Sequence, residues 1–140
     1  MERIKYDASL IKTMSIFETL THTELKDCFI DKNNLLIFVV DEPYMSRAIG
    51  KNGANAKRLE SLLNRKIKIL GFTPNLVQFV RNLIYPLRVE GIDEQGGIIT
   101  IEGNDSRTKG LLIGKNSQNL KNNLSIIQRY FTDIKEIKVD

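Results

Sequence analysis

Apolar positions in the first half of the chain switch repeatedly between helical and alternating spacing, and this switching predicts a short series of elements. Asp and Asn residues between two apolar stretches indicate a tight turn and therefore a hairpin. The predicted order is helix, strand, strand, helix, loop, helix and strand, over residues 9–20, 25–30, 35–40, 44–49, 50–53, 54–63 and 66–70.

The second half repeats this order of elements. Its predicted elements cover residues 75–84, 87–92, 98–101, 107–113, 114–117, 118–130 and 134–139, with a hairpin turn over DEQGG at 93–97. At a constant offset of 64 residues, identities include the tetrapeptide IGKN and the pairs Asn55 with Asn119, Lys57 with Lys121, Ser61 with Ser125 and Arg65 with Arg129. One unit has therefore been used twice.

The repeat predicts an α+β fold with two domains, residues 1–72 and 73–140. Each domain should pack three helices on one face of a three-stranded sheet, because elements with a single apolar face must cover one another. Domains of roughly 70 residues bury only a small core and are marginal alone.

The motif IGKN, at residues 49–52 and 113–116, lies between two predicted helices in each half. Asn-Gly favours a hairpin turn, but the flanking residues follow helical spacing. A phosphate-binding P-loop would need Gly and Ser or Thr where the chain has Met45 and Asn52. A dinucleotide-binding motif should directly follow its strand, whereas residues 41–47 intervene here. No nucleotide cofactor is therefore expected.

A loop between two helices is suited to holding a nucleic-acid backbone. Glycines permit positive φ and leave room for a phosphate, and the helix that follows presents its N-terminal amides and positive dipole end. Lys51 and Lys115 add a positive charge to each loop.

Residues 44–72 hold seven basic residues and one acidic residue, and residues 105–131 hold five basic residues and one acidic residue, in a chain of net charge +4. Two basic windows around one motif favour a polyanionic partner.

Little in the sequence suits catalysis, metal binding or a membrane. Cys28 is expected to pack in a strand, and His22 to lie on the surface near a turn. Asp41 and Glu42 are adjacent, which is not the arrangement of a catalytic pair. We therefore expect a protein that is not an enzyme and needs no metal or cofactor.

The longest apolar run, residues 35–40, is too short to span a membrane, and the first residues do not form a secretory signal. A cytoplasmic location is therefore expected.

The element order, the loop IGKNG and the basic helix after it resemble two tandem KH domains of the type II arrangement, and the resemblance covers essentially the whole chain. The stretches FETLTHTELKDCFID and IFVVDEPYMSRAIGKNGANAKRLE are similar to the first unit of the archaeal NusA family. That resemblance implies a monomeric single-stranded RNA-binding protein of transcription termination or antitermination, with about four nucleotides held by each domain. RNA polymerase or other transcription factors are its candidate further partners.

The residues expected to bind RNA lie in and beside the two loops. They are Arg47, Ile49, Gly50, Lys51, Asn52, Gly53 and Lys57 in the first unit, and Ile113, Gly114, Lys115, Asn116, Ser117 and Lys121 in the second. Ile49 and Ile113 either form the apolar floor of an RNA groove or belong to the core. Ser117 replaces the last glycine of the loop: it is a good N-cap residue, but its side chain fills space, which predicts weaker binding by the second unit.

Two alternatives to this function remain open. A factor in translation or ribosome assembly is one, because type II KH domains also occur on ribosomal proteins and GTPases, although the chain has no GTPase motif. Single-stranded DNA is a second possible ligand, because a phosphate clamp does not read the 2′-hydroxyl. The aromatic content of 7% argues against an RRM, which reads bases by stacking on its sheet.

Overall fold

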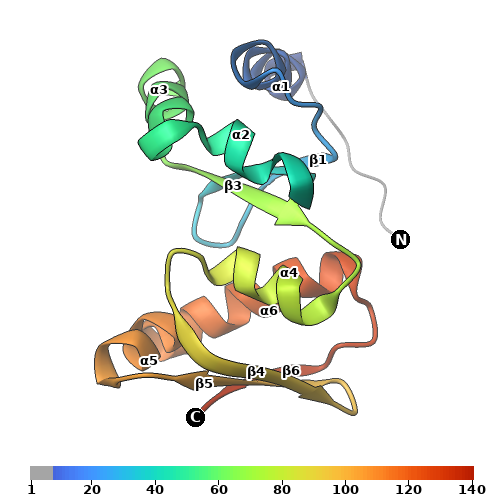
Figure 1. The fold of residues 1–140 in the computed structure, drawn as a ribbon, viewed down its shortest axis with the longest axis vertical. Coiled ribbons are helices and arrows are strands. Elements are labelled where there is room, and N and C mark those ends of the chain that lie inside the picture. The colour runs from blue at the N-terminus through green and yellow to red at the C-terminus, as the bar shows by residue number, and fades with distance from the viewer. Residues whose placement is uncertain (1–7) are drawn as a thin grey trace. The chain divides into compact units, whose positions relative to one another are not determined.

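The computed structural model describes residues 8–140, and these form two compact units (Figure 1). The first unit contains residues 8–30 and 34–72, and the second contains residues 31–33 and 73–140. Each unit carries one three-stranded sheet and three α-helices, which confirms the α+β class.

The first unit follows the predicted order of elements. They are α1 (Ala8–Thr21), β1 (Asp27–Ile30), β2 (Leu36–Asp41), α2 (Met45–Ile49), α3 (Ala54–Leu63) and β3 (Ile67–Phe72). Strand β2 lies in the middle of the sheet, antiparallel to β1 and parallel to β3. A parallel pair needs a long crossover connection, and here α2, the loop and α3 provide it.

The core of the first unit lies between its helices and one face of the sheet. Alternate residues of β2, among them Phe38, are fully buried there together with Phe17 of α1 and Leu59 of α3. The rings of Phe17 and Phe38 stack with their centroids 4.5 Å apart. This packing fixes α1 and α3 against the strands and so determines where the connection between α2 and α3 emerges.

The second unit repeats the topology of the first. Its elements are α4 (Leu76–Ile84), β4 (Val89–Gln95), β5 (Ile98–Gly103), α5 (Ser106–Ile113), α6 (Gln118–Tyr130) and β6 (Glu136–Val139). Strand β5 is antiparallel to β4 and parallel to β6. Ile99 and Ile101 of β5 and Ile127 of α6 are buried, and Phe79 of α4 contacts the rings of Tyr130 and Phe131.

The predicted turn at 93–97 is wrong in its extent. Strand β4 continues to Gln95, which pairs with Ile98, and only Gly96 and Gly97 form the turn. Both glycines have positive φ, 58° and 85°. A two-residue hairpin turn with positive φ at both positions matches the twist of the flanking strands, and Gly-Gly permits it.

The expected places of Cys28 and His22 are confirmed. Cys28 is fully buried in β1 as a free thiol, and His22 is exposed directly after α1, with φ of 53°. Within residues 8–140, His, Cys, Asp and Glu side chains form no group of three that could hold a metal ion. None of the helices described is long and apolar enough to cross a bilayer.

Candidate nucleic-acid interface

The loop of the first unit is a tight connection closed by its own backbone. The amide of Gly50 donates to the carbonyl of Ser46 at 3.0 Å and ends α2, and the amide of Gly53 donates to the carbonyl of Gly50, also at 3.0 Å. Asn52 and Gly53 both have left-handed backbones, with φ of 55° and 74°. Asn and Gly are the residues that adopt this conformation most readily, which explains their places in the motif.

The loop of the second unit has the same conformation. The amide of Gly114 donates to the carbonyl of Gly110 at 2.8 Å, and the amide of Ser117 donates to the carbonyl of Gly114 at 3.3 Å. Asn116 and Ser117 are left-handed, with φ of 56° and 61°. The sequence repeat is therefore also a repeat of backbone geometry.

The first glycine of each loop makes room for an asparagine of the same chain. A Cβ atom on Gly50 would lie 2.9 Å from the backbone nitrogen of Asn55, and one on Gly114 would lie 2.6 Å from Cγ of Asn119. Both glycines also have positive φ, 82° and 74°. The space that a side chain would need at this position is therefore filled by the protein itself.

These two asparagines hold the helix before the loop and the helix after it together. The side-chain amide of Asn55, in α3, donates to the carbonyl of Arg47 in α2 at 3.2 Å. Asn119, in α6, donates in the same way to the carbonyl of Leu111 in α5 at 2.8 Å. The residues were absent from the predicted site, although their identity at the 64-residue offset was a signal for them.

The last loop position differs in residue but not in conformation. A Cβ atom on Gly53 would meet nothing closer than Cε of Lys57 at 4.0 Å, so the first loop is open on this side. Ser117 is the N-cap residue of α6, as expected, but its side chain accepts no capping hydrogen bond. An N-cap side chain reaches the helix amides from an extended backbone, whereas Ser117 has φ of 61° and ψ of 22°.

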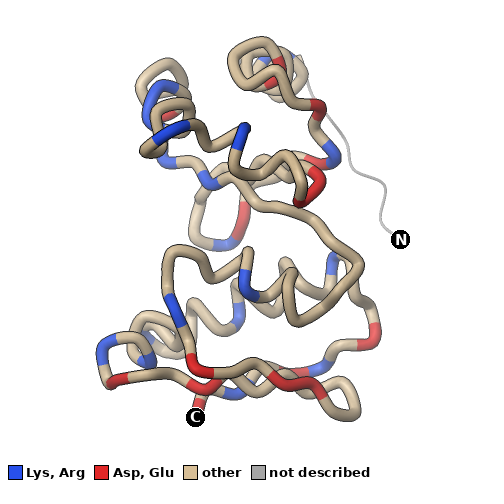
Figure 2. The backbone as a smooth tube through the Cα atoms, in the orientation of Figure 1, with Lys and Arg blue, Asp and Glu red and all other residues tan. Residues whose placement is uncertain are grey.

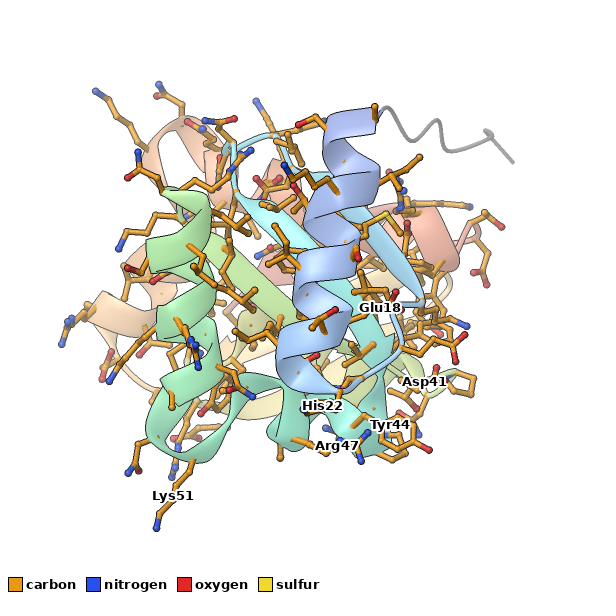
Figure 3. All side chains as sticks on the ribbon, turned by 90° about the horizontal axis from the view of Figure 1, so that it is seen from above. Glu18, His22, Asp41, Tyr44, Arg47 and Lys51 are labelled. Carbon is orange, nitrogen blue, oxygen red and sulfur yellow. The ribbon has the colours of Figure 1, made fainter. Side chains whose placement is uncertain are left out.

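The Lys and Asn side chains predicted for the two loops are exposed. They belong to Lys51, Asn52, Lys115 and Asn116, and Lys51 extends away from the first unit in Figure 3. The other predicted lysines, Lys57 of α3 and Lys121 of α6, are exposed as well. Figure 2 shows basic residues on the loop and on α3 of the first unit, whereas acidic residues of the second unit follow β4 and β5.

Other predicted residues already have contacts within their unit. Arg47 donates to the carbonyl of His22, at the end of α1, and lies over the ring of Tyr44 with Cζ 5.3 Å from the centroid. Ile49 is half-buried and packs against the core of the first unit, which supports its interpretation as a core residue. Ile113 is half-buried too.

The two units enter the helix before the loop differently. Asp105 caps α5: its carboxylate accepts from the amide of Thr108 at 2.7 Å, and this hydrogen bond lowers the pKa of the carboxyl. Asp41, the equivalent residue of the first unit, makes no such side-chain bond, and a 3₁₀ turn over Glu42–Tyr44 leads into α2 instead. The two loops therefore have the same geometry although the helix before each loop begins in a different way.

Comparisons with known proteins agree with this architecture. Residues 13–80 match the KH domain family. Proteins named "Probable transcription termination protein NusA" match nearly the whole chain: that of Methanocaldococcus jannaschii is 24% identical, covering 99% of this chain and 76% of its own length. The protein of that name from Methanococcus vannielii is 29% identical, with coverages of 98% and 80%, and the one from Thermoplasma acidophilum is 27% identical, with 94% and 92%.

Among solved structures, the crystal structure of APE1850 matches with a TM-score of 0.69 and 26% identity, over 96% of this chain and all of that one. The fold, the loop and the family match identify a KH domain in residues 13–80. Along almost its entire length the chain is similar to these archaeal proteins named NusA.

Proposed function

We propose that the protein binds single-stranded RNA through the two loops and acts in transcription termination or antitermination. The observation that carries this proposal is that a KH-family chain presents one exposed Lys-Asn loop geometry twice, each loop closed by an asparagine that joins its two helices. The relatives' names support a role in transcription over one in translation or ribosome assembly.

Both units act as KH domains of the type II arrangement in this proposal. The family match ends at residue 80, so the assignment of the second unit as a KH domain depends on other observations. It shares the element order, the parallel pairing of its last strand and the left-handed loop residues with the first unit. Residues 1–72 and 73–140 are accordingly the two proposed domains.

Each loop binds the backbone of the RNA and leaves the bases to the adjacent groove. The amides at the start of α3 and the positive end of its dipole face an incoming phosphate, and Lys51 adds a full charge beside them. Gly53 keeps the loop open on its outer side. Lys57, whose alkyl chain runs beside Gly53, supplies a second charge within reach of the same strand.

The second loop carries out the same task with Lys115 and Asn116, and Lys121 takes the place of Lys57. Ser117 places a side chain on the outer side of this loop, so the phosphate approaches less closely and the second unit binds more weakly. Arg47 contributes charge from a fixed position, because its guanidinium is bound to the carbonyl of His22. RNA polymerase or another transcription factor is the proposed further partner of the monomer.

Fluorescence anisotropy with single-stranded RNA of roughly 12 nucleotides tests the proposal, since two domains hold about four nucleotides each. The wild type should bind, and a variant with Lys51→Asp, Asn52→Asp, Lys115→Asp and Asn116→Asp should not. Asp tolerates the left-handed backbone of the replaced asparagines, so circular dichroism should show the variant folded. A folded variant that binds RNA as tightly as the wild type does would contradict the proposal. If the wild type binds single-stranded DNA of the same sequence more tightly than RNA, DNA and not RNA is the ligand.

A further inference from the structure

Tyr44 presents an aromatic ring to solvent beside the loop of the first unit. It is the last residue of the 3₁₀ turn Glu42–Tyr44, directly before α2, and 47% of its surface is exposed. A single exposed apolar side chain needs no explanation, so the contacts of the ring decide whether it forms a site.

The ring is part of a fixed composite surface. The guanidinium carbon of Arg47 lies 5.3 Å from the centroid of the Tyr44 ring, within the range of a cation–π contact. Arg47 is itself held by its hydrogen bond to the carbonyl of His22 at the end of α1. Two planar groups from one short helix and the turn before it are thus held in place before any ligand arrives.

The fold does not require this pair. At the equivalent positions of the second unit, 64 residues later, stand Thr108 and Leu111, and that unit builds the same helix, loop and helix around them. Thr108 there gives its amide to the cap residue Asp105. The pairing of a ring with a guanidinium is therefore a property that the first unit has and the second lacks.

The position of the pair relative to the loop suits a base of a bound strand. Tyr44 and Gly50 are separated by α2, so a rise of about 1.5 Å per residue puts them about 9 Å apart along the helix. Figure 3 shows Tyr44, Arg47 and Lys51 along one edge of the unit. The flat ring of Tyr44 suits a planar base rather than a phosphate. A base is the part of a nucleotide that fits there.

We infer that Tyr44 and Arg47 form a stacking site for one base of the single-stranded RNA whose phosphate is bound at Lys51. The inference rests on the proposed RNA binding and adds a base contact that the second unit does not make. Stacking on an aromatic ring tolerates every base, because each has a π-face, and the neighbouring guanidinium strengthens it. The site therefore adds affinity without selecting a sequence.

Photocrosslinking to the wild type tests the site without any change to the protein. A single-stranded RNA that carries 5-iodouridine should crosslink to Tyr44, in the tryptic peptide of residues 33–47. Titrations with Tyr44→Leu and Tyr44→Phe follow. The Leu variant should bind at least about fivefold more weakly, and the Phe variant, which keeps the ring, should bind as the wild type does.

The salt dependence separates this site from the loop. Tyr44→Leu removes no charge, so its log–log salt slope should equal that of the wild type, whereas Lys51→Ala should reduce the slope by about 0.7. Crosslinks that avoid Tyr44, or wild-type affinity in Tyr44→Leu, would overturn the stacking site while RNA binding itself stands. If the wild type binds no RNA, the proposed function fails and the stacking site fails with it.

Discussion

The side-chain amide of Asn119 donates a hydrogen bond to the carbonyl oxygen of Leu111 at 2.8 Å, and Asn55 repeats this bond to Arg47 at 3.2 Å in the other unit. Each bond joins the helix after a loop to the last turn of the helix before it. The loop between them therefore has little freedom left, and its Lys and Asn side chains start from a fixed backbone. Pre-organisation of this kind lowers the entropy cost of binding.

Replacing either asparagine should loosen its loop. Asn119→Ala leaves the carbonyl of Leu111 without this donor and also loses the hydrogen bond that the Asn119 side-chain oxygen accepts from the side chain of Asn33 at 3.2 Å. Urea denaturation should therefore show a loss of about 1–2 kcal/mol. Asn119→Asp should cost more, because a carboxylate would face that carbonyl oxygen. Ser61→Ala, on the exposed side of α3, is the control and should change stability by less than about 0.5 kcal/mol. Wild-type stability in Asn119→Ala would show that the bond does not hold the helices.

The two glycines of the first loop should respond differently to alanine. Gly53→Ala meets only the strain of a left-handed backbone, about 1–2 kcal/mol, because the nearest atom lies 4.0 Å away. Gly50→Ala meets a backbone with φ of 82° and ψ of 164°, a region that essentially only glycine adopts, and a backbone nitrogen of Asn55 at 2.9 Å. It should therefore cost at least about 2 kcal/mol more. Thermal melts of both variants measure the difference. Equal losses would mean that the contact with Asn55 does not matter.

Ser117→Gly should stabilise the protein. Ser117 occupies a left-handed backbone with φ of 61° and makes no capping bond, so its replacement removes strain of about 1 kcal/mol and loses no such contact. The reverse change, Gly53→Ser, should destabilise the first unit by a similar amount. If Ser117→Gly lowers the denaturation midpoint instead, the serine makes a stabilising interaction that its geometry does not suggest.

Acid should weaken the start of α5 through Asp105. The hydrogen bond from the amide of Thr108 lowers the pKa of the Asp105 carboxyl in the folded state, so its stabilising effect is present above the ordinary carboxyl pKa. It is lost as the pH falls below about 4, toward the lower folded value. Asp105→Asn keeps a capping side chain without the charge. Between pH 5 and pH 3 the free energy of unfolding of this variant should therefore fall less than that of the wild type, because the variant lacks the titration of the Asp105 carboxyl. Parallel pH profiles would refute this role.

The order of elements was predictable because the spacing of apolar residues over a short segment differs between helices and strands. Residues 54–63 and 118–130 form helices with the predicted bounds, since each carries an uninterrupted helical pattern between clear ends. Strand β4 extends beyond its prediction because Asp93 and Glu94 are exposed. Polar residues on an exposed strand resemble a turn in sequence, and only the pairing with β5 makes them part of the sheet.

The position and exposure of the two loops were predictable from the sequence, whereas the contacts that support them were not. Repetition of IGKN pointed to Lys51 and Lys115, because a repeated exposed motif needs no tertiary information to be found. The contact of Gly50 with Asn55 depends on how the chain returns over the loop, and the sequence alone does not show it. Equally, nothing local indicated that Arg47 would be bound to the carbonyl of His22, a residue 25 positions away.

The most direct measurement is the salt dependence of RNA binding by the wild type and by two paired variants, Lys51→Asp/Asn52→Asp and Lys115→Asp/Asn116→Asp. Single-strand binding has a log–log slope of about −0.7 per neutralised phosphate, so several contacts should give about −3 for the wild type. Each pair should weaken binding and flatten the slope, the first pair more than the second. Unchanged affinity and slope in both folded variants would mean that the loops are structural turns and not RNA-binding sites.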